Sequence, residues 1–265
     1  MWKKILAVFI GAVIGYWFID DFDPESLRGK RVLVTGASGG IGEQLAYHYA
    51  SFGAHVIVTS RREQALQQES VRQLGGLDIL VLNHIRAHAL SPWTGSHDNL
   101  TLLQNILDVN LRSYIHLSSH AMPHLQQRHG SVIVMSSLAG KVGIPYVAAY
   151  SSSKFALNGF FSALRNEFTT AGTTVSITIC TIGLVGTENA LRYLKDFGSS
   201  AALLSILKPA EPADAALAVV KGGAVRAREI VYPYMSVKPL CLLRDWMPEL
   251  TNWIVRLTTT PPSLR

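Results

Sequence analysis

The sequence predicts an α/β fold with a doubly wound parallel sheet, and three observations support this class. Short apolar segments alternate along the chain with longer segments that have helical periodicity. The apolar segments are nearly continuous, which is typical of parallel strands buried on both faces. A chain of 265 residues with 48% hydrophobic side chains can bury one large core, so we expect one main domain.

The expected elements follow one another in the order that this fold requires. Arg31–Thr35 (RVLVT) is a short apolar run that ends in glycines, and a helix-like pattern follows from Ile41 to Ser51. His55–Ser60 (HVIVTS) has the apolar character of a second strand. The remaining expected elements are strands at Ile79–Leu82, Ser131–Ser136, Val175–Thr181 and Glu229–Tyr232, and helices at Leu102–Arg128, Tyr150–Thr170 and Ala210–Lys221.

The net charge of +6 narrows the classes of partner. No run of Lys or Arg is longer than two residues, so we expect no nucleic-acid groove. An anionic lipid or a phosphorylated cofactor fits this charge better. Cys180 and Cys241 are too few for a disulfide framework, and we expect no metal site.

Residues 1–22 have the pattern of a signal anchor or a signal peptide. Lys3 and Lys4 precede an apolar run from Ile5 to Ile19, which acidic residues close. The run is shorter than the roughly 20 residues of a full span, but it lacks an obvious cleavage site and ends in aromatic residues, which favours a retained anchor. The flanking charges then predict an endoplasmic reticulum membrane protein with a lumenal catalytic domain. Cleavage and secretion remain the alternative, and Asn99 lies in a glycosylation sequon in either case.

A glycine-rich turn lies between the first strand and the helix that follows it, where a Rossmann-type domain binds the phosphates of a dinucleotide. Gly36 permits the tight turn, Gly40 lets the backbone approach a pyrophosphate, and Gly42 lets the helix pack on the strand. The other residues expected to bind there are Ser38, Gly39 and Ile41. A purely structural turn is the competing interpretation.

The end of the second strand predicts which dinucleotide binds. An acidic residue there would accept from a ribose hydroxyl, but Ser60, Arg61 and Arg62 occupy this place. A guanidinium such as that of Arg61 suits a 2′-phosphate, so NADP(H) is preferred over NAD. An ordinary surface arginine is the alternative.

Tyr150 and Lys154 open the long helix at a spacing of four, which puts phenol and ammonium on one face. The lysine is expected to lower the pKa of the phenol and to hold the nicotinamide ribose. The strand SVIVMS ends at Ser136 and Ser137, and the Ser137 hydroxyl is expected to bind the substrate oxygen. The order of these motifs along the chain makes the pattern specific.

This combination resembles the short-chain dehydrogenase/reductase family over nearly the whole chain from Arg31. The resemblance implies a catalytic set of Asn110, Ser137, Tyr150 and Lys154. Tyr150 would be the general acid and base, Ser137 and Tyr150 would bind substrate, and Asn110 would hold a water of the proton relay. It further implies cofactor contacts from Asn83, His84, Ile85, Val185 and Thr187, although Ile182-Gly183 stands where the family has Pro-Gly.

A narrower resemblance is to the 11-beta-hydroxysteroid dehydrogenase group, and to its type 1-like branch. It is carried by GASGGIG, VLNHI, SSLAGKV, AAYSSSKFALNGFFSALR, KGGAVR and CLLRDWMPE. The resemblance implies a lipophilic, steroid-like alcohol or ketone as substrate. The apolar stretch between Thr187 and Pro209 would then cap the substrate, with core packing as the alternative.

One segment departs from the family. Only Arg61–Gly76 separates the second strand from the next one, where the family places a helix, a strand and a helix. One helix fits, at Gln64–Leu74, and the sheet is expected to lack an edge strand. Two hypotheses follow, an active NADP(H) oxidoreductase and a membrane-tethered pseudoenzyme that binds cofactor poorly.

Residues 28–235 are thus expected to form the NADP-binding catalytic domain. In the segment 236–265, apolar residues and two tryptophans recur at helical spacing beside basic residues. This pattern predicts an amphipathic segment that docks on a membrane. A homodimer interface is the competing interpretation.

Overall fold

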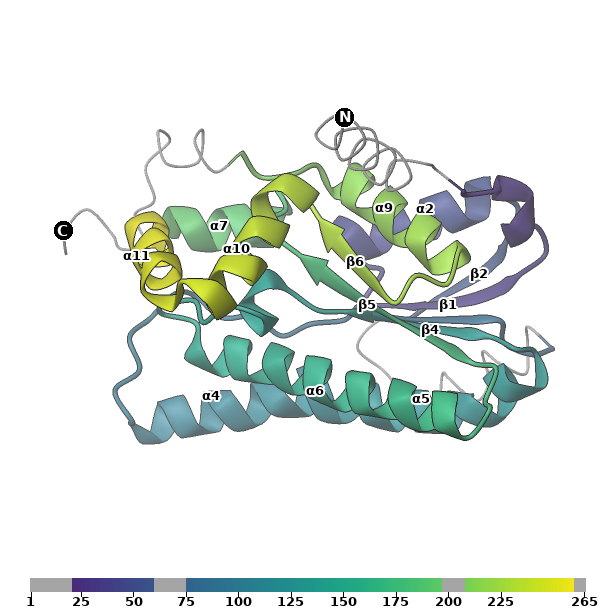
Figure 1. Ribbon diagram of the computed structural model, residues 1–265, viewed down its shortest axis with the longest axis horizontal. Coiled ribbons are helices and arrows are strands. Elements are labelled where there is room, and N and C mark those ends of the chain that lie inside the picture. The colour runs from purple at the N-terminus through teal and green to yellow at the C-terminus, as the bar shows by residue number, and fades with distance from the viewer. Residues whose placement is uncertain (1–20, 60–74, 197–207, 260–265) are drawn as a thin grey trace, which may run out of the picture.

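Six parallel strands form one sheet in the order β2-β1-β3-β4-β5-β6 (Figure 1). The computed structural model describes residues 21–59, 75–196 and 208–259. The strands are β1 Arg31–Thr35, β2 His55–Thr59, β3 Ile79–Leu82, β4 Ser131–Met135, β5 Ser176–Ile182 and β6 Glu229–Tyr232. All six lie within one residue of the predicted bounds, and the predicted doubly wound α/β class is confirmed.

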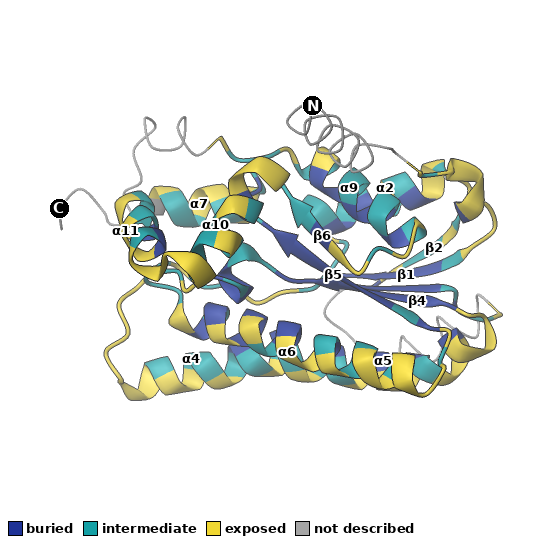
Figure 2. Cartoon of the chain, viewed as in Figure 1, coloured by how far each residue is buried: buried dark blue, intermediate teal, exposed yellow. Residues whose placement is uncertain are grey.

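Helices cover both faces of this sheet. Figure 1 shows α2 (Gly40–Ser51) and α9 (Pro212–Ala224) on one face. On the other face lie α4 (His97–Leu107), α5 (Ser113–Gln127) and α6 (Ala148–Thr170). In Figure 2 the buried residues follow the strands and the helix sides that face them.

Two clusters of buried side chains form the core, one on each face of the sheet. Successive residues of one strand point to opposite faces, so Val32 joins the cluster under α2 and α9 while Leu33 joins the cluster under α5 and α6. Tyr49 of α2 and Phe161 of α6 are fully buried in the respective clusters. The two clusters pack the strands tightly from both sides. The loops after the carboxyl ends of these strands carry most residues of the candidate active site.

β2 is an edge strand within the described part of the chain, since it pairs with β1 alone. Val58 on β2 is 54% exposed, which is unusual for an apolar strand of this fold. The predicted lack of an edge strand thus agrees with the observed strand order. The expected helix Gln64–Leu74 and Arg61 lie outside the described residues.

The predicted helix Leu102–Arg128 is instead a longer helical run that starts at His97. The Ser96 hydroxyl caps its first turn by accepting from the Asn99 amide at 3.3 Å. A five-residue π-turn, η2 (Asp108–Arg112), interrupts the run between α4 and α5. Inserted turns of this kind often occur at functional sites, and η2 carries Asn110.

The C-terminal segment forms two helices, α10 (Tyr234–Trp246) and α11 (Pro248–Thr259). The break falls at Met247, because a residue before proline is disfavoured in the helical conformation. In residues 21–59, 75–196 and 208–259, no helix is long and apolar enough to cross a bilayer. The predicted anchor falls mostly outside the described residues.

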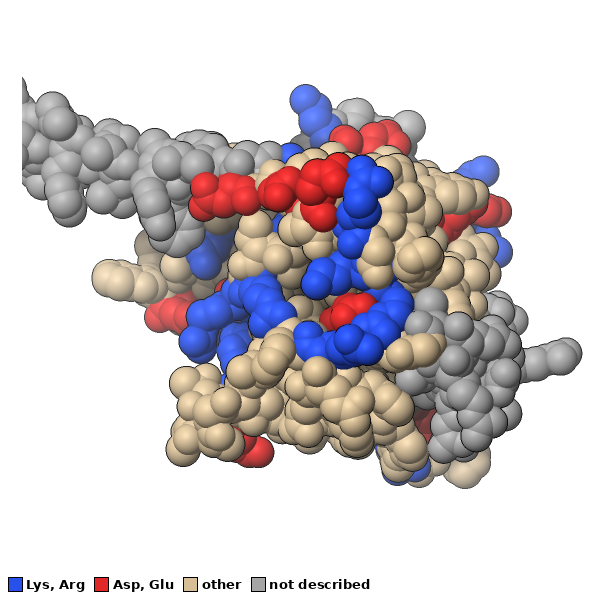
Figure 3. Space-filling model, turned by 90° about the vertical axis from the view of Figure 1, so that its right-hand side faces the viewer, with Lys and Arg blue, Asp and Glu red and all other residues tan. Residues whose placement is uncertain are grey.

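The surface at the amino ends of the strands is rich in basic side chains (Figure 3). Arg31 at the start of β1 forms an ion pair with Asp78 just before β3, with Nε and Oδ2 at 2.7 Å. Both side chains are largely buried, so the pair fastens these two strands together.

Candidate active site

The glycine turn after β1 is closed by contacts that leave no room for side chains. Gly36 has a φ of +65°, and a Cβ atom there would lie 2.5 Å from the Cα of His84. A Cβ atom at Gly42 would lie 2.2 Å from the Gly36 carbonyl oxygen and 2.4 Å from Nδ2 of Asn83. These two positions therefore require glycine, as the sequence predicts.

The start of α2 fits a phosphate group. Ser38 and Gly39 are exposed at this turn, and no side chain caps the helix N-terminus. The free amides of a first helical turn attract anions. Gly40 faces the Thr187 side chain across the turn, with 3.0 Å between a Cβ built on Gly40 and Cγ2 of Thr187. Ile41 lies beside them and is partly buried.

Asn83 and its neighbours connect the end of β3 to the same turn. The Asn83 side-chain amide donates to the carbonyl oxygens of Thr35 and Gly36 at 3.1 and 3.0 Å. Its backbone amide donates to the Thr35 hydroxyl at 2.9 Å. Ile85 is 52% exposed just beyond, so its side chain is accessible from the carboxyl edge of the sheet.

Tyr150 and Ser137 lie side by side at this edge. Ser137 follows β4, and Tyr150 lies in the first turn of α6. Burial raises the pKa of the Tyr150 phenol, and a side-chain hydrogen bond with Ser137 opposes that rise. The structure thus brings together the two groups that the sequence assigned to the substrate oxygen.

Lys154 is buried one helical turn beyond Tyr150. Its Nζ atom lies 5.7 Å from the centre of the Tyr150 ring and 5.5 Å from that of Tyr114. It donates to the Met135 carbonyl oxygen at 2.7 Å. Burial lowers the pKa of this ammonium to about 7. The expected lowering of the phenol pKa by lysine is not what the structure has, since burial dominates and Ser137 supplies the opposing effect.

Asn110 is fully buried, and both ends of its amide are bonded. The side-chain oxygen accepts from the Arg86 backbone amide at 2.7 Å, and Nδ2 donates to the Arg86 carbonyl oxygen at 3.0 Å. Nδ2 also lies 3.1 Å from the Ser153 hydroxyl. Asn110 therefore links the loop after β3 to α6, next to Lys154.

The loop after β5 carries Val185 and Thr187. Val185 is buried and pairs with Ala210, while the Thr187 amide donates to the Val185 carbonyl oxygen at 2.8 Å. A Cβ atom at Gly183 would lie 2.6 Å from Cγ2 of Val237. Helix α10 therefore packs directly on this loop, in which Ile182-Gly183 replaces the proline-glycine of the family.

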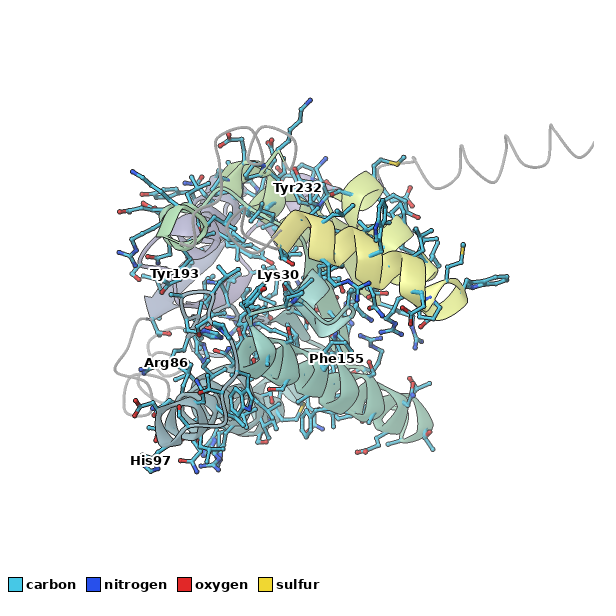
Figure 4. All side chains as sticks on the ribbon, turned by 90° about the vertical axis from the view of Figure 1, so that its left-hand side faces the viewer. Lys30, Arg86, His97, Phe155, Tyr193 and Tyr232 are labelled. Atoms are coloured by element: carbon cyan, nitrogen blue, oxygen red, sulfur yellow. The ribbon has the colours of Figure 1, made fainter. Side chains whose placement is uncertain are left out.

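Figure 4 looks onto the end of the molecule at which the strands terminate. Tyr193 of α7 (Glu188–Asp196) and Arg86 of the loop after β3 lie on the same side of this end in the view. Sequence reasoning missed Ser153, Tyr114 and the contact of α10. A short motif could not have indicated them, because each depends on partners distant in sequence.

A family model described as short chain dehydrogenase matches residues 30–70 and 64–196. A protein of Xenopus tropicalis named Hydroxysteroid 11-beta-dehydrogenase 1-like protein is 43% identical, over 96% of this chain and 96% of its own. The protein of the same name from Gallus gallus is 42% identical, over 85% of this chain and 86% of its own.

Two solved structures share the fold. One is a short chain dehydrogenase/reductase from Burkholderia phymatum in complex with NAD, with a TM-score of 0.70, 19% identity and coverage of 85% of this chain and 96% of that one. The other is ligand-free aldohexose dehydrogenase from Thermoplasma acidophilum, with a TM-score of 0.66, 20% identity and coverage of 78% and 94%.

The comparisons also locate the departure from the family. The family match is split into two pieces that meet at residues 64–70, inside the short connection after β2. The alignment with the Xenopus tropicalis protein spans 286 positions, more than the 265 residues of this chain, so it contains gaps in this chain. With the match on both sides of the split and identity well above 30% over nearly the full length, this chain belongs to the short-chain dehydrogenase/reductase family of oxidoreductases.

Proposed function

We propose that this chain is an NADP(H)-dependent oxidoreductase that interconverts a hydroxyl and a ketone on a lipophilic, steroid-like substrate. The observation that carries the proposal is the convergence of Ser137, Tyr150 and Lys154 at the carboxyl edge of the sheet, the edge at which the glycine turn also begins. The relatives named hydroxysteroid 11-beta-dehydrogenase 1-like protein support the steroid class.

In the direction of ketone reduction, the Tyr150 phenol donates its proton to the substrate oxygen. The Ser137 hydroxyl lies beside that phenol and donates a hydrogen bond to the same oxygen, where negative charge develops. In the direction of alcohol oxidation the phenolate takes the proton back. NADP(H), when bound, supplies or accepts the hydride.

Lys154 acts on the protonation of Tyr150 and on the cofactor ribose. Its pKa of about 7 means that Lys154 is half protonated near neutral pH. Nζ would donate to the ribose of a bound cofactor, and this contact would favour the charged form of Lys154, which would then stabilise the phenolate. Asn110, held between Arg86 and α6, positions the outer end of this relay.

The cofactor phosphates are proposed to bind at Gly36–Gly42, where the uncapped start of α2 offers free amides. The bound NAD in the Burkholderia phymatum structure supports a nicotinamide dinucleotide. Arg61, directly after the end of β2, is the proposed partner of a 2′-phosphate and the reason for preferring NADP(H). Val185 and Thr187 would contact the nicotinamide end.

The substrate is proposed to enter beside α7. Tyr193 and Leu194 on this helix are partly buried, and Leu191 is 38% exposed. These apolar side chains suit a lipophilic ring system, whose reacting oxygen Ser137 and Tyr150 would orient.

The proposed association with a membrane rests on the leader and on the last two helices. The apolar side chains exposed on α10, α11 and the junction between them are Met235, Leu242, Trp246, Met247, Trp253 and Leu257. Tryptophan beside aliphatic residues on one surface suits the headgroup region of a bilayer. We propose the endoplasmic reticulum membrane with a lumenal catalytic domain, with secretion and a homodimer interface as alternatives.

Membrane docking has a direct test with residues 21–265, which lack the apolar leader. These should sediment with vesicles of phosphatidylcholine and phosphatidylserine, and Trp246→Glu should weaken that binding because it places a charge in the interface. Trp93→Glu is the matched control, since Trp93 is 45% exposed in a different part of the fold. Equal binding by all three proteins would contradict docking through these helices.

A membrane-tethered pseudoenzyme is the second candidate. The observation that favours it is the position of β2 at the edge of the sheet, where the family places a further strand beside the adenine. A turnover assay with NADPH and a steroid ketone separates the two candidates. Ketone-dependent NADPH oxidation that is lost in Tyr150→Phe supports the enzyme, and a chain that folds without oxidising NADPH supports the pseudoenzyme.

A further inference from the structure

The imidazole of His84 lies between the cofactor turn and the turn that carries Asn110. Its Nδ1 atom is 2.8 Å from the Thr35 hydroxyl at the end of β1, and its Nε2 atom is 2.6 Å from the Ser113 hydroxyl at the start of α5. One ring thus spans the gap between them.

The backbone of the same residue is also fixed. The Tyr114 hydroxyl donates to the His84 carbonyl oxygen at 2.8 Å, and the two rings pack with their centres 4.7 Å apart. A Cβ atom at Gly36 would collide with the His84 backbone. The ring therefore cannot shift without disturbing either the glycine turn or the buried Tyr114.

The protonation of the ring follows from its partners and its surroundings. Burial, and then the charge of Lys154, lower the pKa of His84 to about 4, so the ring is neutral at working pH. The Thr35 hydroxyl donates to the Val81 carbonyl oxygen at 3.1 Å, and the Ser113 hydroxyl donates to the Val109 carbonyl oxygen at 2.6 Å. Both hydroxyl oxygens therefore face the ring as acceptors, and the tautomer of the ring decides which of them receives its proton.

Ser113 is the residue that follows η2, and its hydroxyl bonds inside this turn through Val109. The hydroxyl that contacts Nε2 is therefore tied to η2, the turn that carries Asn110. Thr35, which contacts Nδ1, also accepts from the backbone amide of Asn83 and precedes Gly36. A displacement of η2 or of the glycine turn would therefore be transmitted to the other turn through the His84 ring.

We propose that His84 is a positioning residue, whose ring holds the Asn110 turn in register with the cofactor-binding turn. The inference rests on the proposed function, because it assigns the two turns to cofactor binding and proton relay. His84 acts through Thr35 on one side and through Ser113 on the other.

Two substitutions separate the two contacts of the ring. Asparagine places its amide where Nδ1 lies, so His84→Asn keeps the Thr35 contact and loses Ser113. Glutamine places its amide where Nε2 lies, so His84→Gln keeps the Ser113 contact and loses Thr35. A residue that only filled space would not distinguish these variants.

The two variants should show opposite kinetic signatures, each about threefold to tenfold, the size expected for one lost neutral hydrogen bond. His84→Asn should lower kcat and leave the Kd of NADPH within about twofold, and His84→Gln should raise that Kd and leave kcat within about twofold. Ser113→Ala should reproduce His84→Asn, and the double variant should add nothing further. Ser118→Ala is the matched control, because this buried hydroxyl of α5 donates only to the Ile115 carbonyl oxygen.

Hydrogen exchange of the backbone amides of residues 108–112 gives a readout that needs no turnover. In the cofactor-free chain, His84→Asn and Ser113→Ala should exchange about threefold to tenfold faster there than wild type, and His84→Gln and Ser118→Ala should not. Equal exchange in all five proteins would contradict the proposal that the His84 ring links the two turns. Equal changes of Kd and kcat in both His84 variants would contradict it as well. A wild-type chain that binds no NADPH would refute the proposed function. The positioning role of His84 would then be tested by the exchange rates alone.

Discussion

The Nζ atom of Lys154 donates to the Met135 carbonyl oxygen at 2.7 Å, in a buried contact between α6 and the last residue of β4. This contact fixes the register between the two elements that carry Tyr150 and Ser137. Nζ is hydrogen-bonded to the backbone and lies 5.7 Å from the Tyr150 ring centre. The phenol forms its side-chain hydrogen bond with Ser137.

Tyr150→Phe should abolish turnover while leaving NADPH affinity nearly unchanged, because it removes only the transferable proton. Loss of a general acid lowers the rate by about 10²–10⁴-fold. Steady-state kinetics with a fluorescence titration measures both effects. Tyr47→Phe is the control, since this exposed phenol on α2 bonds only Glu43. Activity of Tyr150→Phe within twofold of wild type would eliminate Tyr150 as the acid and base.

The stability of the cofactor-free chain should rise with pH between about 7 and about 10. Lys154 has a pKa of about 7 in the folded chain and about 10.4 when unfolded, so the unfolded chain binds more protons in this window. The free energy of unfolding then increases by up to about 1.4 kcal/mol per pH unit. Below pH 7 both states are protonated, and the cost of the buried charge is fully present.

Urea unfolding at pH 6, 8 and 9.5 measures this dependence. Lys154→Met should be more stable than wild type at pH 6 and should lose the part of the pH slope that Lys154 contributes. Identical slopes for the two proteins would show that the buried ammonium is not the group that titrates.

Arg61→Ala should weaken NADPH much more than NADH. The substitution removes a charge-assisted contact with the 2′-phosphate, worth about 1.5–3 kcal/mol. Parallel titrations with the two cofactors measure the difference, and Arg28→Ala is the control because Arg28 pairs with Glu25 on an exposed surface. Equal weakening of both cofactors would show that Arg61 does not read this phosphate.

Gly42→Ala should prevent the glycine turn from closing. The added methyl group would lie 2.2 Å from the Gly36 carbonyl oxygen, and a backbone atom cannot move aside cheaply. Such overpacking costs about 1–3 kcal/mol, so both the melting temperature and the NADPH affinity should fall. Gly159→Ala is the matched control on α6, with nothing within 4 Å of the new Cβ atom. A Gly42→Ala chain that binds NADPH like wild type would contradict the close packing at this turn.

The sequence predicted the six strands closely because each is a continuous apolar run whose neighbours are turns or glycines. Ile79–Leu82 was matched to the residue. The start of α4 at His97 was missed, because its first turn is exposed and polar and a capping serine alone defines it. The break at Met247 has a local cause, because Pro248 follows it and begins α11.

The candidate site was predicted as a set of residues but not as a network. The motifs placed Tyr150, Lys154 and Ser137 correctly at one edge, since their spacing along strand and helix is local. The contacts of Asn110 with Ser153, and of His84 with Ser113, join residues about 30–40 positions apart. Such pairings depend on how α5 and α6 pack together, which no short pattern in the sequence expresses.

Restoring the missing segment tests its importance for stability. A family-length insert from a close relative, placed in the connection after β2, should supply an edge strand that pairs with β2. The same strand should line one side of the adenine site. We expect the restored chain to melt higher and to bind NADPH more tightly, by a few kcal/mol, which is a large share of the roughly 5–15 kcal/mol that stabilises a domain. If the short chain melts as high and binds as tightly, the strand is dispensable and the pseudoenzyme hypothesis falls.

The most direct test of the account is a fluorescence titration of the purified wild-type chain with NADPH. We expect saturable binding, with a Kd within about 1 μM–1 mM, the usual range of Michaelis constants. Gly42→Ala should weaken this binding at least about tenfold, because it blocks the proposed phosphate site. A folded wild-type chain that shows no saturable binding would contradict the claim that it is an NADP(H)-dependent oxidoreductase.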